Sequence, residues 1–571
     1  MGNQIPPFWF NSIIYHNFFQ NLWFFHSKNI LMNQNNDKKT ASIPLIISVS
    51  VAIGIFLGAT IFGKKSLSTH SGINGSIFNE VLMNIKNSYV DEVNVDSLSE
   101  YGISKMLEKL DPHTAFIPAK DAELVSSELH DGFDGIGVEF NIFNDSLYVV
   151  TALSGGPSEA VGIKTGDIIL QADTVNLTGK KLNNNLVFKS LRGPRNSIVK
   201  LKIKRKGFGK PLFFNVKRDK IPTFSIDAAY LMADKKTGYI KINRFAETTY
   251  DEFVAHLKNL KSAGMQQLMI DLRDNPGGYM DKATDIVDEL VGGNGVIVYT
   301  KGKDKANNYE VKAEKEGIFE KGKIVVLVDE GSASASEIVS GSLQDYDRAT
   351  IVGRRTFGKG LVQAPIKLSD GSELRLTISR YYIPSGRSIQ KPYTLGHGEE
   401  YMEDMHKRFS QKELFIKDSI KYNQKLKFKT KGGRTVYGGG GITPDIFVPQ
   451  DTSYYTPYLV ELFAQNIFRE FTMKYALEHQ NELKAMGFQK YLSSYNLDEK
   501  VLAGLKLTAQ QKGIKFSEKD FALSKDYIKL YTKALIARNI WKRNEKEGLT
   551  NEFYQVFNQD DPMIRKGLAS F

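Results

Sequence analysis

An apolar run that ends in alternating serines is the first segment with residue types suited to catalysis. Residues 324–328 are all apolar, and Ser332, Ser334 and Ser336 follow before a helical pattern begins. The pattern predicts a buried strand that turns into a helix, and the amides at a helix N-terminus stabilise developing negative charge. A helix needs only one serine as its N-cap. Three serines therefore exceed what capping requires and suit a nucleophile at this turn.

A lysine between two glycines stands directly before another predicted strand. It is Lys359, in the segment Phe357-Gly-Lys-Gly-Leu-Val-Gln363. A tight loop can desolvate the ammonium group, which lowers the pKa of the lysine until the neutral amine acts as a general base. Taken alone, the same lysine would also suit phosphate binding or ordinary contact with solvent.

Two consecutive glycines, Gly277 and Gly278, follow a third apolar run. Because neither has a Cβ atom, their backbone N–H groups can approach an anion or an oxyanion closely. An ordinary turn is the default interpretation of such a pair. All three segments lie at strand ends, however, which is where open α/β sheets bind their ligands.

Together, and in their order along the chain, the three segments resemble the C-terminal processing peptidases, or tail-specific proteases, which are serine peptidases with a Ser–Lys dyad. The resemblance covers most of the chain between about residues 75 and 450. It runs through residues 131–173, 238–278, 325–363, 381–390 and 438–449.

The resemblance implies a role for each matching residue. Ser334 matches the nucleophile, Lys359 the general base and Gln363 the residue that orients the lysine. The implied oxyanion hole uses the amide of Ala335 and one amide of the glycine pair, and the resemblance does not choose between the two glycines. We therefore expect a serine endopeptidase.

A second glycine-rich segment resembles the PDZ domain of the same family. It consists of Gly135, Ile136, Gly137 and Val138, together with residues 155–167. PDZ domains capture the C-terminus of a polypeptide by strand addition. The resemblance implies that this segment binds the terminal carboxylate of proteins or peptides with free apolar C-termini. In the family the domain either delivers substrate or blocks the site until a ligand binds, and the sequence does not say which.

Other functions stay open at this point. A Ser–His–Asp hydrolase is disfavoured because none of the 9 histidines lies in the three strand-end segments, although a triad does not require proximity in sequence. We interpret His113, in Asp111-Pro-His-Thr114, as a structural residue of a turn or a helix terminus. A catalytically inactive, membrane-tethered PDZ scaffold would have no chemical need for the serine, lysine and glutamine together. An acyl-CoA enzyme would not need a PDZ-like segment.

The elements that must position these residues alternate between strands and helices from about residue 220 to residue 388, which predicts an α/β core. The predicted strands are residues 238–242, 267–271, 324–328, 349–352, 361–366 and 373–381, and the predicted helices are residues 249–263, 280–291 and 334–345.

Around this core we predict an α+β multidomain protein. Residues 199–204 alternate lysines with Val199, Leu201 and Ile203, as in a strand with one solvated face. The predicted parts are a leader (1–42), a transmembrane signal-anchor (43–62), a helical lead-in (77–125), an inserted PDZ domain (126–206), the α/β serine protease core (220–390), a Lys-rich insertion (391–434), a return to the core (435–450) and a helical C-terminal domain (455–571).

The uncharged stretch from Ile43 to Phe62 predicts a single membrane span. At about 1.5 Å per residue, it covers roughly the 30 Å of a hydrocarbon core. A short basic segment, a span and a long domain in this order favour an inner-membrane protein whose catalytic domain faces the periplasm. A buried core helix and a cleaved signal peptide are the alternatives.

Residues 1–31 are interpreted separately. Met32 is the better translation start, which would make residues 1–31 an untranslated extension, and an interfacial aromatic anchor is the rival interpretation of these residues.

Composition excludes several classes of protein. A chain of 571 residues with 41% hydrophobic and 25% charged residues is neither a single small module nor disordered. Without cysteine, disulfides, thiolate metal sites and a cysteine nucleophile are impossible. No metal cluster, Walker loop or dinucleotide fingerprint appears, so we expect no cofactor, no metal and no nucleic acid. The formal charge of +12 is modest for this length, and the oligomeric state stays open.

Overall fold

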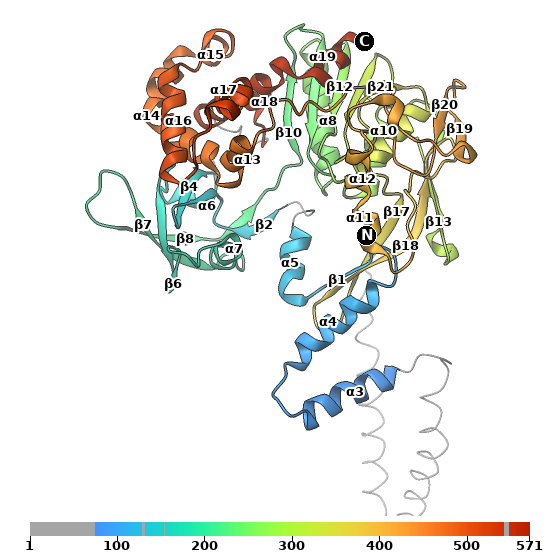
Figure 1. Cartoon of the computed structure of the whole chain (residues 1–571), viewed down its shortest axis with the longest axis horizontal. Coiled ribbons are helices and arrows are strands. Elements are labelled where there is room, and N and C mark those ends of the chain that lie inside the picture. The colour runs from blue at the N-terminus through green and yellow to red at the C-terminus, as the bar shows by residue number, and fades with distance from the viewer. Residues whose placement is uncertain (1–74, 128, 130–131, 154, 542–547) are drawn as a thin grey trace, which may run out of the picture. The chain divides into compact units, whose positions relative to one another are not determined.

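The computed structural model describes residues 75–571, apart from 128, 130–131, 154 and 542–547 (Figure 1). The chain divides into two compact units, one ending at Val95 and the other running from Asp96 to Phe571. In the first unit the described helix is α3 (Gly75–Ser88). The predicted leader and membrane span lie outside the described residues and stay predictions. In the part that is described, no helix is both long enough and apolar enough to cross a membrane.

The second unit is built around a six-stranded central sheet with the strand order β10-β11-β12-β15-β16-β21. Strand β10 is antiparallel to β11, and all the other neighbours are parallel. The continuous apolar runs in the sequence are explained by this arrangement, because parallel strands are covered on both faces. The strands are β10 (Ile226–Leu231), β11 (Thr237–Ile242), β12 (Gln267–Asp271), β15 (Ile324–Val328), β16 (Ala349–Gly353) and β21 (Ile446–Phe447).

Two groups of helices cover the two faces of this sheet. Alternate strand residues such as Ile270 and Val326 pack with helices α8, α9 and α10, whereas Met269 and Val325 pack with Met563 on the other side. The helix beneath the second face is thus α19, from the very end of a region that the sequence suggested was a separate helical tail. These helices are α8 (Thr249–Ser262), α9 (Met280–Asp288), α10 (Ala335–Asp345), α18 (Asn551–Phe557) and α19 (Pro562–Ala569).

A second, antiparallel sheet carries two of the strands that the sequence suggested for the core. Strand β18 pairs with β1, β13 and β17, and β13 also pairs with β14. Since only residues 368–372 separate β17 from β18, the two form a hairpin and cannot be parallel neighbours. The strands are β1 (Ala115–Ile117), β13 (Val296–Gly302), β14 (Glu310–Lys312), β17 (Leu361–Lys367) and β18 (Glu373–Tyr382).

Residues 133–221 form a small antiparallel unit, which we call the β domain. Its main sheet has the order β3-β4-β5-β7-β8, and its two ends meet where β2 pairs with β9. The solvated face predicted for β7 is confirmed, because Val199, Leu201 and Ile203 are buried while Lys200 and Lys204 are exposed. The elements are β2 (Phe133–Gly135), β3 (Val138–Phe143), β4 (Ser146–Ala152), α6 (Pro157–Ala160), β5 (Ile168–Ala172), β6 (Val175–Asn176), α7 (Asn184–Leu191), β7 (Ile198–Lys204), β8 (Leu212–Lys217) and β9 (Asp219–Ile221).

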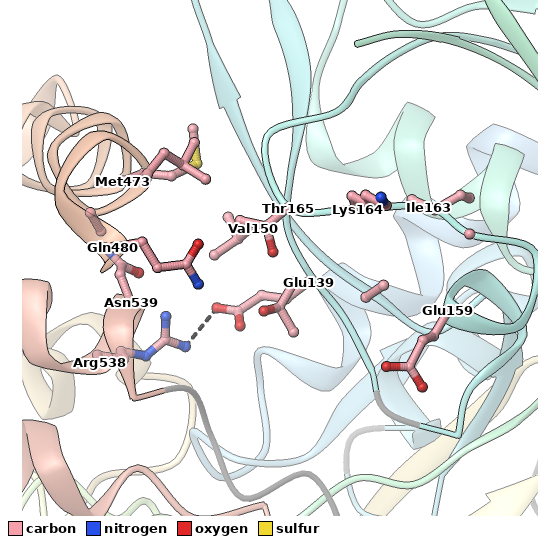
Figure 2. A pocket seen from close by; sticks show the side chains of 15 residues that line it. Glu139, Val150, Glu159, Ile163, Lys164, Thr165, Met473, Gln480, Arg538 and Asn539 are labelled. Carbon is pink, nitrogen blue, oxygen red and sulfur yellow. Dashed lines mark hydrogen bonds and ion pairs between the residues drawn. The ribbon is translucent and has the colours of Figure 1, made fainter. Parts of the chain in front are cut away.

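Residues 457–540 form a helical bundle with its own apolar core, which we call the helical domain. A cavity of about 440 Å³ lies between this domain and the β domain, as Figure 2 shows. The helices are α13 (Pro457–Ala464), α14 (Ile467–Met486), α15 (Phe488–Ser494), α16 (Glu499–Gln511) and α17 (Glu518–Ile540).

Candidate active site

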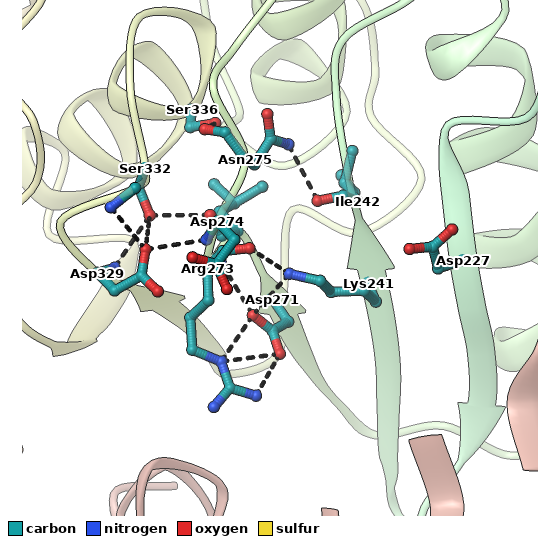
Figure 3. Close-up of polar contacts among 12 residues, drawn as sticks. Asp227, Lys241, Ile242, Asp271, Arg273, Asp274, Asn275, Asp329, Ser332 and Ser336 are labelled. Atoms are coloured by element: carbon teal, nitrogen blue, oxygen red, sulfur yellow. Dashed lines mark hydrogen bonds and ion pairs between the residues drawn. The ribbon is translucent and has the colours of Figure 1, made fainter. Parts of the chain in front are cut away.

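The turn between β15 and α10 holds Ser334 in an unusual backbone conformation. Its φ is 53° and its ψ is −112°, a region in which a residue with a side chain is strained. The serines on either side hold the turn in place: the Ser332 hydroxyl donates to the Leu272 carbonyl at 2.8 Å, and the Ser336 hydroxyl donates to the Asn275 carbonyl at 2.9 Å (Figure 3). Two of the three serines are therefore structural, and Ser334 is left as the candidate nucleophile.

The loop after β12 brings Gly277 against this turn. A Cβ atom on Gly277 would lie 2.8 Å from the Ser334 Cβ and 2.9 Å from the Ala335 nitrogen, and the φ of Gly277 is +100°. Only glycine fits at such a close approach. The Asn275 side chain fixes the loop, because its Oδ1 accepts from the Gly277 N–H at 2.9 Å and its Nδ2 donates to the Ile242 carbonyl at 3.0 Å.

An ionic cluster beneath the loop anchors its first residues. Figure 3 shows Asp271 between Lys241, whose Nζ lies 3.5 Å away, and Arg273, whose Nη2 donates to the carboxylate at 2.6 Å. Burial opposes ionisation of Asp271, but the charges of Arg273 and Lys241 outweigh it and hold its pKa well below the usual range. Arg273 also pairs with Asp561 at 2.5 Å, so this cluster ties the loop to α19.

The glycine-flanked loop places Lys359 as the sequence suggested. Its Nζ donates to Gln363 Oε1 at 2.8 Å, and Gln363 in turn donates through Nε2 to the His113 carbonyl. Burial lowers the pKa of Lys359, and the charge of Arg375 lowers it further. The structure thus brings Lys359 and Gln363 together, and the lowered pKa of Lys359 favours its neutral amine.

One buried carboxylate, Glu337, joins the serine turn to the lysine loop. It accepts from the Ser334 N–H at 2.9 Å, the Gly358 N–H at 2.7 Å and the Lys359 N–H at 2.8 Å, and also from the Thr356 hydroxyl. Burial raises the pKa of Glu337 to about 7, although these hydrogen bonds favour the anion. We did not assign this residue from the sequence. The Ser-x-x-Glu spacing of a capping box was the available signal.

A buried tyrosine also connects the serine turn to the lysine loop. The Tyr381 hydroxyl, on β18, lies 3.1 Å from the Ser334 carbonyl oxygen and 2.6 Å from the Lys359 carbonyl oxygen. The backbones of Ser334 and Lys359 therefore share two partners, Glu337 on their amide side and Tyr381 on their carbonyl side.

Comparison with known proteins shows the family to which this chain belongs. Residues 236–396 match peptidase family S41. The chain is 34% identical over 346 residues to a carboxy-terminal-processing protease of Bartonella bacilliformis, and the match covers 59% of this chain and 78% of that protein. The chain belongs to the carboxy-terminal processing proteases. It is thus a serine peptidase with a mixed α+β fold.

Other matches are similar. The carboxy-terminal processing protease CtpA of Bacillus subtilis is 30% identical over 350 residues, covering 61% of this chain and 73% of that protein. Among solved structures, the photosystem II D1 C-terminal processing protease is 24% identical with a TM-score of 0.33, covering 66% of this chain and 88% of that one. Residues 458–542, nearly the whole helical domain, match a family of unknown function.

His113 lies in a turn beside the candidate active site, where its carbonyl oxygen accepts from Gln363. The Asp111 carboxylate accepts from the His113 N–H at 3.0 Å, and the His113 Nε2 is hydrogen bonded to the Tyr401 hydroxyl at 2.9 Å. Burial and the charge of Lys359 lower the pKa of His113 to about 4. Among the hydrogen bonds of the described residues, the Lys359 amine donates to Gln363 and not to the Ser334 hydroxyl, and His113 pairs with Tyr401.

The Lys-rich segment predicted as an insertion packs directly against the lysine loop. Arg408 donates to the Thr356 carbonyl at 2.8 Å, Glu413 pairs with Arg355 at 2.6 Å, and Tyr401 packs edge-on against the Phe357 ring. This segment therefore holds the lysine loop in place, and several of its own lysines are exposed to solvent.

The residues predicted to bind a chain terminus lie together in the β domain. Gly135 ends β2, Ile136 and Gly137 form the link, and Val138 begins β3. The φ of Gly137 is +69°, which favours glycine. Strand β3 is an end strand of its sheet, since β4 is its one partner among the described strands. A strand edge is thus available directly beside the glycine-rich link.

Proposed function

We propose that this protease cleaves polypeptides with Ser334 as the nucleophile and Lys359 as the general base. The neutral Lys359 amine takes the proton of the Ser334 hydroxyl while Oγ attacks the carbonyl carbon of the scissile bond. The same amine then gives that proton to the leaving nitrogen, and an acyl-enzyme remains. Water, deprotonated in the same way, releases the acid and restores the serine. The observation that carries the proposal is the Glu337 carboxylate, which accepts from both the Ser334 and the Lys359 backbone amides at 2.9 Å and 2.8 Å.

We further propose that the oxyanion hole consists of the Ala335 and Gly278 amides. Ala335 is the first residue of α10, where the helix dipole favours negative charge. The Gly277 N–H already donates to Asn275 Oδ1 at 2.9 Å, so it is not available to substrate. Gly278 is exposed, and within the described residues its N–H has no hydrogen-bond partner. These two facts favour Gly278 over Gly277.

We propose that the β domain acts as a PDZ domain and selects substrates by a free apolar C-terminus. The link from Gly135 to Val138 offers backbone amides for a carboxylate, and the β3 edge offers a partner for the last residues of the chain. The aromatic rings of Phe140 on β3 and Phe188 on α7 lie 5.7 Å apart beside this edge and suit an apolar terminal side chain.

Amidating the substrate C-terminus is expected to lower kcat/KM by about tenfold, because the amide removes the charge and one acceptor of the carboxylate. The effect is measured by comparing the cleavage rates of two peptides of the same sequence, one with a free and one with an amidated C-terminus. Gly135 and Asp219 are register partners in β2 and β9, so replacing residues 136–218 with a short Gly-Ser linker removes the domain without separating its ends. The free and amidated peptides should then be cut at equal rates. Equal rates in the intact protease would show that this segment does not read the terminus.

We propose that residues 43–62 anchor the protease in the inner membrane with its domains in the periplasm. The support is the uncharged 20-residue stretch followed by a long domain. Alkaline phosphatase fused after Phe571 is expected to be active, and a fusion of a cytoplasm-dependent fluorescent protein at the same place is expected to be dark. The reverse pair of results would place the domains in the cytoplasm, and release of the protein by osmotic shock would show that the span is cleaved.

A further inference from the structure

The helical domain contacts the outer face of the β domain through three kinds of interaction. Met473 on α14 is buried with Phe143 and Val150 of the β3–β4 hairpin. The Asn144 side chain, in the hairpin turn, donates to Glu470 Oε1 at 3.1 Å. Arg538 on α17 donates to Glu139 Oε1 at 2.6 Å, as Figure 2 shows.

The contact leaves the β3 edge free. Along β3, the side chains of Val138, Phe140 and Ile142 pack on the core of the β domain. Glu139 and Phe143 lie on the opposite face, because successive residues of a strand alternate. The helical domain therefore touches one face of β3, while the unpaired edge of the same strand can still take up another chain.

Gaps at this contact indicate that it is reversible. Two hollows of about 440 and 230 Å³, each partly open to solvent, lie between the two domains, and Val150, Met473 and Arg538 line both. Permanent interfaces are packed as densely as protein interiors. The two charged side chains, Glu139 and Arg538, keep 33% and 29% of their surface exposed, so salt can weaken their attraction.

The same C-terminal region is attached much more firmly to the protease core. Met563 and Ile564 of α19 are buried against the central sheet, and Asp561 pairs with the buried Arg273 at 2.5 Å. Tyr554 of α18 adds a hydrogen bond to Asp227 on β10 at 3.1 Å. Helix α18 also packs on the helical domain, because Val556 is buried in the apolar core of that domain and Phe557 packs against it. These contacts can hold the helical domain on the protease core when the β domain moves.

We propose that the helical domain is a docking platform for the β domain. The docking surface is the face of α14 and α17 around Met473 and Arg538, its partner is the outer face of the β3–β4 hairpin, and the Glu139–Arg538 pair is the electrostatic part of the attachment. Docking fixes the place from which the β domain presents its free strand edge, and undocking lets the β domain move while the helical domain stays on the core. This gives the helical domain a role within the protease.

The absence of native cysteine makes a direct test possible. Lys200 on β7 and Lys490 on α15 are both exposed, and cysteines at these two positions can carry spin labels on the full-length protein. Pulsed electron resonance then measures the distance distribution between the two domains. Because the measurement needs no cleavage, it can be made in a Ser334→Ala background, and a failure of the proposed dyad does not affect it.

We expect one dominant distance in the labelled protein, at low salt. Arg538→Glu and Glu139→Arg each place like charges together and should lower the ratio of docked to undocked protein by about five- to tenfold. The exchanged pair, Glu139→Arg with Arg538→Glu, should restore it. Lys519→Glu, a charge reversal at an exposed position of the same helix α17, should have no effect.

The proposal is wrong if either single reversal leaves the distance distribution unchanged, or if the exchanged pair fails to restore it. Thermal unfolding of each variant checks that the domains are folded, and a single variant that loses its fold is replaced by Glu139→Gln or Arg538→Gln. Raising NaCl to about 0.5 M should lower the docked fraction of the unsubstituted protein by a few-fold. A docked fraction insensitive to salt would exclude the ion pair as a part of the attachment.

Discussion

Ser334→Ala and Lys359→Ala are each expected to lower kcat/KM for peptide-bond cleavage by about 10⁴-fold or more, which is the scale seen when one member of a catalytic unit is removed. The serine variant lacks the attacking oxygen, and the lysine variant lacks the group that takes its proton. The double variant should be no worse than either single variant, because the two residues act in the same step. Cleavage of an unfolded protein, followed by mass spectrometry, measures the loss, and circular dichroism checks the fold.

Lys359→Arg tests whether Lys359 acts as a general base or only as a positive charge. A guanidinium stays protonated and cannot accept the serine proton, so this variant should be as inactive as the alanine variant. In the unsubstituted protease, kcat/KM should rise with pH as Lys359 loses its proton, with a midpoint below the ordinary lysine pKa of about 10.4, because burial lowers the pKa of this group. Appreciable turnover by the arginine variant would exclude the general-base role.

Glu337→Gln is expected to lower kcat/KM by about 10²-fold and the free energy of unfolding by about 2–4 kcal/mol. The carboxylate accepts three backbone N–H groups and one hydroxyl. A glutamine amide turns one of these acceptors into a donor that faces other donors. The Ser334 and Lys359 backbones then lose their shared partner. Steady-state kinetics and urea unfolding of the same preparation measure the two effects.

The control is Glu314→Gln, which removes an exposed carboxylate and should change neither quantity. The pH profile supplies a second check. Because burial raises the pKa of Glu337 to about 7, protonation below that pH removes an acceptor, and kcat/KM should fall as the pH drops through 7. The glutamine variant should lack this step. A Glu337→Gln protease with normal kinetics would show that the carboxylate does not hold the two loops.

The parts of the fold that could be predicted are those with strong local patterns. Strands 267–271 and 324–328 have the predicted bounds, because both are continuous apolar runs that a doubly covered parallel sheet requires. The contact between Lys359 and Gln363 was suggested by the family resemblance and not by their spacing, because residues four apart in extended backbone are about 13 Å apart and only long side chains can bridge them.

The parts that could not be predicted depend on contacts between distant segments. The donors on Glu337 come from residues 19 to 22 positions away as well as from its own turn, and no local pattern shows that they converge. The choice between Gly277 and Gly278 depends on where the Asn275 side chain points. The place of α19 under the central sheet depends on apolar residues, among them Met563, whose spacing fits any amphipathic helix.

The contacts that hold the lysine loop are completed late in the synthesis of the chain. Arg408 and Glu413, which hold the loop at Thr356 and Arg355, follow those residues by 52 and 58 positions. Because a chain emerges from the ribosome N-terminus first, a nascent protein that already contains Ser334 and Lys359 still lacks the segment that fixes the lysine. We therefore expect the lysine loop to be held in place only after residue 413 has been made and has folded onto it.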